Sequence, residues 1–124
     1  MGERNILLVE DEEYIRENLT EILEMNGYKV SAAANGEAGI EIARKRNYDV
    51  VLTDLKLPGM SGIEVIRNIR RFSPHTVCIV LTGYASVETA VEAMRAGAFT
   101  YVEKPCEKDE LLVTIEKAYE MHSL

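Results

Sequence analysis

Three acidic residues lie directly after two apolar segments of the chain and form the first candidates for chemistry. Glu10 and Asp11 follow the apolar segment 5–9, and Asp54 follows the segment 48–53. Continuous apolar segments of this length are typical of strands buried on both faces of a parallel sheet. Residues just past such strands lie at the carboxyl edge of the sheet, where open α/β sheets bind ligands. Carboxylates gathered there repel one another, so they must share protons, titrate at raised pKa values or hold a cation.

A hydroxyl and an ammonium group follow two further apolar segments and extend this candidate site. Thr82 comes directly after the segment 77–81, and Lys104 directly after the segment 99–103. Mg²⁺ prefers oxygen ligands, which the three carboxylates offer. Together with the lysine as a point charge and the hydroxyl as a donor, such a cation could stabilise a phosphoryl group on Asp54.

Each of these residues also has an ordinary structural interpretation. Acidic residues at the start of a helix complement the helix dipole, and we assign this role to Glu12 and Glu13. Asp54 could cap a helix, Thr82 could start a turn, and Lys104 could be a surface lysine. Their placement at the same end of their strands favours a site, because unrelated structural residues would scatter over both edges of the sheet.

Five apolar segments alternate with five helical patterns along the chain. The expected strands lie near residues 5–9, 28–33, 49–53, 77–81 and 99–103. The apolar residues that define the helical patterns are Ile15, Leu19, Ile22 and Leu23, then Ile40 and Ala43, then Ile63, Ile66 and Ile69, then Val87, Ala90, Val91 and Met94, and finally Leu111, Leu112, Ile115, Ala118 and Tyr119. The fourth set is small and predicts a weakly anchored helix. The alternation predicts a parallel sheet with helices on both faces and right-handed crossovers.

Composition narrows the function further. The chain has 124 residues, 47% of them hydrophobic, and a formal net charge of -7, so we expect one globular domain over residues 1–124. An acidic protein is poorly suited to displacing counterions from nucleic acid. No segment has the length of a membrane span or the character of a secretory signal. Cys78 and Cys106 show no disulfide or metal spacing and fit a reducing, cytoplasmic location.

Four motifs, in this order, resemble the response-regulator receiver domain of bacterial two-component signalling. They are Ile6 to Glu12, Asp54 to Gly59, Leu81 to Gly83, and Tyr101 to Pro105. The resemblance covers essentially the whole chain. It implies a flavodoxin-like, CheY-like α/β fold with five parallel strands in the order 2-1-3-4-5 and five helices on both faces. Residues 82–99 are similar to receivers that control sigma-54-dependent transcription activators.

The resemblance implies a metal site and a phosphoacceptor. Asp54 would be the residue that is phosphorylated. Mg²⁺, with Mn²⁺ as an alternative, would be held by Asp11, by Asp54 and by the backbone carbonyl of Lys56, with Glu10 acting through a water. Glu10 departs from the Asp that is commonest in the family, and this bears only on the local metal geometry.

The resemblance also implies a switch and a set of partners. Lys104 would contact the phosphoryl group, Thr82 and Tyr101 would move together on phosphorylation, and the bond before Pro105 would be cis. Cys106 stands where a Phe often follows this proline. The phosphoryl donor would be a sensor histidine kinase, and the output an effector domain, a partner protein or a homodimer, with transcription as the regulated process. The domain would not be an enzyme, although it would assist its own phosphorylation and dephosphorylation.

Other functions on the same fold remain as alternatives. A flavodoxin would need a Ser/Thr/Gly-rich phosphate loop after the first strand, where this chain has four acidic residues. A phosphatase with an aspartyl nucleophile normally has a second acid two residues after the first, and Lys56 occupies that position. A protein-interaction module that is never phosphorylated would not require the placement of Thr82 and Lys104.

Overall fold

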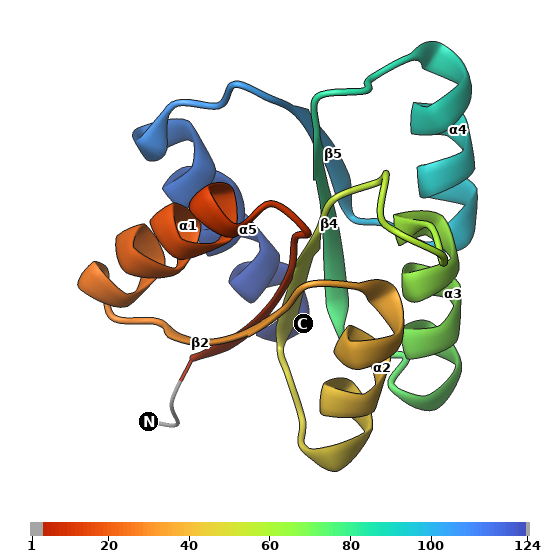
Figure 1. The fold of residues 1–124 in the computed structure, drawn as a ribbon. Helices are drawn as coiled ribbons and strands as arrows, with labels where there is room; N and C mark the ends of the chain where they lie inside the picture. Colours follow the sequence, from red (N-terminus) through yellow and green to blue (C-terminus); the bar gives the residue numbers. More distant parts are fainter. Residues whose placement is uncertain (1–3, 124) are drawn as a thin grey trace.

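The computed structural model describes residues 4–123 and contains a five-stranded parallel sheet flanked by five helices (Figure 1). The strands are β1 (Asn5–Val9), β2 (Lys29–Ala33), β3 (Val50–Thr53), β4 (Val77–Thr82) and β5 (Thr100–Glu103). Their order across the sheet is β2-β1-β3-β4-β5, and every neighbouring pair is parallel. The predicted fold and strand order are therefore confirmed.

Local sequence determines where the helices begin and end. The five helices of the described residues are α1 (Glu13–Met25), α2 (Gly36–Lys45), α3 (Gly62–Phe72), α4 (Val87–Ala96) and α5 (Lys108–Ser123). The Asn35 side chain caps α2, while Ser61 and Ser86 begin α3 and α4 with reciprocal capping boxes. Gly97 ends α4 at a φ of 107°, in the left-handed region that favours glycine. Among residues 4–123, no helix is both long enough and apolar enough to cross a lipid bilayer.

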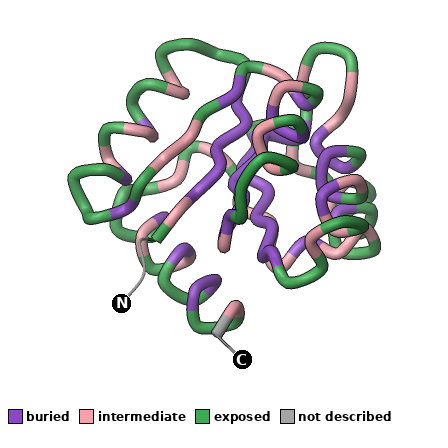
Figure 2. Tube along the Cα trace, turned by 90° about the horizontal axis from the view of Figure 1, so that it is seen from below, coloured by how far each residue is buried: buried purple, intermediate pink, exposed green. Residues whose placement is uncertain are grey.

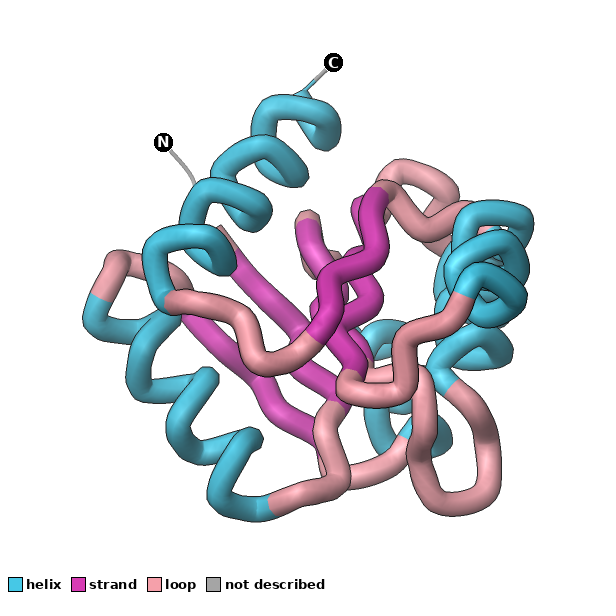
Figure 3. The backbone as a smooth tube through the Cα atoms, turned by 90° about the horizontal axis from the view of Figure 1, so that it is seen from above, coloured by secondary structure: helices cyan, strands magenta, loops and turns pink. Residues whose placement is uncertain are grey.

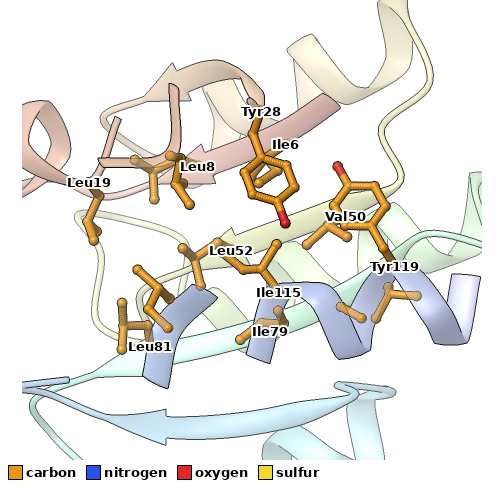
Figure 4. Close-up of a cluster of buried hydrophobic side chains, with 14 residues drawn as sticks. Ile6, Leu8, Leu19, Tyr28, Val50, Leu52, Ile79, Leu81, Ile115 and Tyr119 are labelled. Atoms are coloured by element: carbon orange, nitrogen blue, oxygen red, sulfur yellow. The ribbon is translucent and has the colours of Figure 1, made fainter. Parts of the chain in front are cut away.

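The two faces of the sheet bury separate hydrophobic clusters. Helices α1 and α5 cover one face, and α2, α3 and α4 cover the other (Figure 1). On the first face, Leu8, Leu52 and Ile115 pack together, and the rings of Tyr28 and Tyr119 stack with their centroids 5.5 Å apart (Figure 4). Every residue of β3 and β4 is buried, as Figure 2 shows for the centre of the molecule. This two-sided burial explains the continuous apolar segments in the sequence.

The apolar pattern of α4 faces the solvent. Val87 is 82% exposed, Val91 43% and Met94 49%, whereas Ala93 is fully buried. The helix therefore rests on the sheet through small side chains, and its larger apolar side chains are uncovered. This agrees with the weak anchoring expected from the sequence, since alanine buries little apolar area.

Candidate functional site

The parallel sheet brings the ends of four strands to one edge. Figure 3 views the molecule from above, onto the side where the loops that follow the strands gather. Val9 is paired with Thr53, and Thr82 with Glu103, so the residues that end or follow these strands share one edge. This register explains how residues far apart in the sequence meet at one site.

Three carboxylates lie together at this edge. One oxygen from each of Glu10, Asp11 and Asp54 lies within 4.8 Å of the others. Glu10 and Asp54 are buried, at 2% and 7% exposure, whereas Asp11 is exposed. A cavity of about 730 Å³ opens here, lined by the three acidic residues and also by Lys56 and Lys104. Solvent can reach the cluster through this cavity.

Backbone and side-chain donors hold the Asp54 carboxylate in place. Its Oδ1 accepts hydrogen bonds from the backbone N–H of Leu55 at 2.7 Å and of Lys56 at 3.4 Å. Its Oδ2 accepts from Lys104 Nζ at 3.0 Å. Among residues 4–123, these three groups are the hydrogen-bond donors to this side chain, and the Thr82 hydroxyl is not one of them.

Lys104 joins the two buried carboxylates. Its Nζ also donates to Glu10 Oε1 at 2.7 Å. Burial raises the pKa of the Glu10 carboxyl, and the hydrogen bond from Lys104 opposes this rise without cancelling it. Burial acts to lower the pKa of Lys104, but its hydrogen bonds to Glu10 and Asp54 raise that pKa above the ordinary value. The lysine is therefore charged at neutral pH and partly neutralises the acidic cluster.

Among residues 4–123, neither Thr82 nor Tyr101 lines this cavity. Thr82 is buried, and its hydroxyl oxygen accepts a hydrogen bond from the backbone N–H of Tyr84 at 3.1 Å. Tyr101 is half-buried, and its hydroxyl lies 2.7 Å from Thr89 Oγ1 at the start of α4. The hydroxyl groups of Thr82 and Tyr101 thus have separate partners in this structure.

Two further features of the site concern the loops around Asp54. The Lys104–Pro105 peptide bond is cis. The Lys56 ammonium lies 4.5 Å from the centroid of the Tyr84 ring, so the loops after β3 and β4 touch across the mouth of the cavity. Tyr84 is exposed.

Sequence reasoning missed two residues that support the site. A Cβ added to Gly62 would lie 2.1 Å from the backbone oxygen of Asp54, so only glycine allows α3 to begin this close to Asp54. Arg16 Nη1 donates to the backbone oxygens of Glu10 at 2.9 Å and Asp11 at 3.2 Å. The sequence carries no signal for either contact, because each depends on a close approach between a helix and a loop.

The donor set fits a hard divalent cation. Carboxylate oxygens are the ligands that Mg²⁺ prefers, and an octahedral ion keeps several waters, which the open side of the cavity can admit. Within residues 4–123, no nitrogen or sulfur ligand joins the acidic group formed by Glu10, Asp11 and Asp54. Since the charge of Lys104 only partly offsets the three carboxylates, the residues present suit a cation of this kind.

Comparison with known proteins identifies the family. The model of the response regulator receiver domain matches residues 6–116, and the chain belongs to that family. It is 39% identical over 119 residues to the regulatory protein AtoC of Escherichia coli, covering 96% of this chain and 26% of AtoC. It is also 39% identical over 120 residues to the transcriptional regulatory protein FixJ of Rhizobium meliloti, covering 97% of this chain and 59% of FixJ. The chain therefore spans only part of these relatives.

Solved structures agree with the family assignment. A CheY-like receiver domain from Methanospirillum hungatei has a TM-score of 0.95 and 33% identity, with 98% of both chains covered. The beryllofluoride-activated NtrC4 receiver domain dimer has a TM-score of 0.91 and 35% identity, with 96% of this chain and 98% of that one covered. The protein is thus a receiver domain of two-component signalling, and the flavodoxin and phosphatase alternatives are set aside.

Proposed function

We propose that Asp54 accepts a phosphoryl group from the phosphohistidine of a sensor histidine kinase. The observation that carries this proposal is the Asp54 carboxylate, held 3.0 Å from Lys104 Nζ at the edge of an open acidic cavity. Attack by an Asp54 oxygen forms a P–O bond while the P–N bond of the donor breaks. The histidine nitrogen leaves with the electron pair of that bond.

Oxygen groups of the chain would hold the metal that this transfer needs. Bound Mg²⁺ supplies positive charge to the phosphoryl oxygens and orients them. Asp11, Asp54 and the backbone carbonyl of Lys56 would hold the ion directly, and Glu10 would act through a water. Mn²⁺ suits the same oxygen ligands.

Lys104, Thr82 and Tyr101 complete the proposed mechanism. The Lys104 ammonium would leave its present carboxylate partners and neutralise a phosphoryl oxygen. Thr82 would turn its hydroxyl toward another phosphoryl oxygen. Tyr101 would then turn inward and give up its hydrogen bond to Thr89. The same groups would assist loss of the phosphoryl group to water, so the domain is a signalling switch and not an enzyme acting on a separate substrate.

Phosphorylation with acetyl phosphate tests the assignment. With Mg²⁺ present, the intact mass of the wild type should increase by one phosphoryl group, and removal of the metal by a chelator should prevent this. Asp54→Ala should not be labelled, whereas Asp109→Ala, which removes an exposed aspartate at the start of α5, should be labelled normally. Persistent labelling of Asp54→Ala would refute the assignment.

We further propose that phosphorylation alters the surface formed by α4, β5 and α5, and so controls an effector domain, a partner protein or a homodimer. The exposed apolar residues of α4 support this, as does the dimer formed by the activated NtrC4 receiver. Beryllofluoride should increase the molar mass measured by sedimentation, and Val91→Glu should prevent the increase. If the amide exchange of residues 83–106 stays constant on activation, the switch assignment is wrong. A constant molar mass by itself would exclude only the homodimer.

The remaining parts of the proposal concern the setting of the domain. Residues 1–124 would act as one receiver unit, in the cytoplasm, where Cys78 and Cys106 remain reduced. Transcription would be the regulated process, although this domain would not bind DNA itself because its net charge is -7. A salt-sensitive shift of duplex DNA by the isolated chain would contradict this.

A further inference from the structure

Arg16 lies directly beneath the acidic loop that joins β1 to α1. Its Nη1 donates to the backbone oxygen of Glu10 at 2.9 Å and to that of Asp11 at 3.2 Å. One guanidinium nitrogen therefore bridges the carbonyl groups of two consecutive residues. Arg16 is half-buried on the first turns of α1, so the position of this helix determines the position of the loop.

In the part of the chain that the structure describes, other hydrogen bonds restrain this loop at Glu10 but not at Asp11. The backbone N–H of Glu10 donates to Ala33 O at 3.0 Å, which continues the pairing of β1 with β2. The Glu10 carboxylate accepts from the backbone N–H of Glu12 at 3.0 Å. Among residues 4–123, Asp11 has a single hydrogen bond, which its backbone oxygen accepts from Arg16. Arg16 is therefore the contact that restrains the most exposed of the three carboxylate residues.

We propose that Arg16 is a positioning residue for the divalent cation at this site. By bridging the two carbonyls it holds the backbone of Glu10 and Asp11 so that their carboxylates point at one position near Asp54. This matters for Mg²⁺, which demands near-ideal octahedral geometry at short distances, and much less for Ca²⁺, whose coordination is flexible. The inference rests on the metal site proposed above.

If Arg16 acted only through its charge, its removal would change metal binding in the opposite direction. This difference allows a clear test. A cation close to a metal site repels the metal, so removal of the charge alone should tighten binding of Mg²⁺ and Ca²⁺ alike. Loss of positioning should weaken binding of Mg²⁺ and change Ca²⁺ binding little. The direction of the change thus separates a positioning role from an electrostatic one.

The experiment is a titration of the whole chain with MgCl₂ and with CaCl₂, followed through the backbone amide NMR signals of residues 54–56. In Arg16→Met we expect the Kd for Mg²⁺ to rise roughly tenfold, as is typical for loss of a partner that orients metal ligands. The Kd for Ca²⁺ should rise less than about threefold. Arg71→Met removes an exposed arginine on α3 and is the matched control, with both constants unchanged.

A second variant guards against a failure to fold. Arg16→Lys keeps the charge on a shorter side chain, and we expect its Kd for Mg²⁺ to rise several-fold, with a smaller change for Ca²⁺. Tighter or unchanged Mg²⁺ binding in Arg16→Met, or equal weakening of both ions, would overturn the positioning role. If Arg16→Met does not fold, wild-type Mg²⁺ affinity in Arg16→Lys would overturn it. If the wild type itself does not respond to Mg²⁺, the metal site proposed above fails as well.

Discussion

Replacing Lys104 with Met should destabilise the protein because two buried carboxylates would lose their shared cation. The Lys104 ammonium lies 2.7 Å from Glu10 Oε1 and 3.0 Å from Asp54 Oδ2. Removing one partner of a buried ion pair typically costs about 3–5 kcal/mol. The Lys104 side chain is 20% exposed, so water compensates in part. We therefore expect the free energy of unfolding to fall by about 3 kcal/mol at pH 7 without divalent cations, which corresponds to roughly 10 °C in the melting temperature.

The size of this loss should depend on pH. Burial already raises the pKa of Glu10 above the ordinary 4.5, and Lys104 is the largest influence that opposes the rise. In Lys104→Met the pKa of Glu10 therefore rises further, and the folded variant takes up a proton at a higher pH than the unfolded chain does. Because this uptake favours the folded state, the deficit should shrink as the pH falls from about 7 toward about 5.

At alkaline pH the wild type should instead lose the extra stability that the charged Lys104 gives it over Lys104→Met. The pKa of Lys104 is raised above the ordinary 10.5 in the folded protein. Its stabilising contribution is fully present below 10.5 and is lost as the pH rises through the folded pKa. The difference in unfolding free energy between the wild type and Lys104→Met should therefore be largest between about pH 7 and pH 10.5.

Mg²⁺ should reduce the deficit because it replaces the missing positive charge. A ligand that binds only the folded state stabilises it by mass action. The variant lacks the competing ammonium, so a given concentration of Mg²⁺ should raise its melting temperature by more than that of the wild type.

The assay is urea unfolding followed by circular dichroism at pH 5, 7 and 9, with and without MgCl₂. Lys117→Met removes an exposed lysine on α5 and should change the free energy of unfolding by less than about 0.5 kcal/mol. If Lys104→Met behaves like this control at pH 7, or its deficit is the same at pH 5 and pH 7, the electrostatic account of the cluster is wrong.

Three further predictions follow from single contacts. Gly62→Ala should lower the free energy of unfolding by more than about 2 kcal/mol, because its Cβ would meet backbone oxygen at 2.1 Å, whereas Gly83→Ala, with nothing within 4 Å, is the control for urea unfolding. Thr89→Val removes a capping hydroxyl and its contact with Tyr101, so the free energy of unfolding should fall by about 1 kcal/mol and amide exchange at the start of α4 should become faster. Unchanged exchange would contradict this. Burial and neighbouring acids raise the pKa of Cys106 to about 11, so its reaction with a disulfide reagent should be slow at pH 8 and accelerate toward pH 11; rapid labelling at pH 8 would refute this.

The sequence by itself determined the architecture and the composition of the site. Buried parallel strands require continuous apolar segments, so the alternation with helical patterns specified the parallel sheet. Residues that follow such strands must lie at one edge of the sheet, which brought Glu10, Asp54 and Lys104 together in the prediction. The caps formed by Asn35 and Ser86 are also a property of local sequence, because each side chain accepts from the backbone N–H of a nearby residue, Ala38 and Thr89 respectively.

Only the tertiary structure decided how these groups contact one another. The bonds from Lys104 to Glu10 and Asp54 join residues 94 and 50 positions apart, and their existence depends on the rotamer and depth of each side chain. The bridge made by Arg16 depends on how α1 packs against the loop after β1, and the close approach at Gly62 depends on how α3 packs against the loop after β3. Periodicity indicates that a helix has an apolar face, but contacts between distant segments decide whether that face is covered, and in α4 it is not.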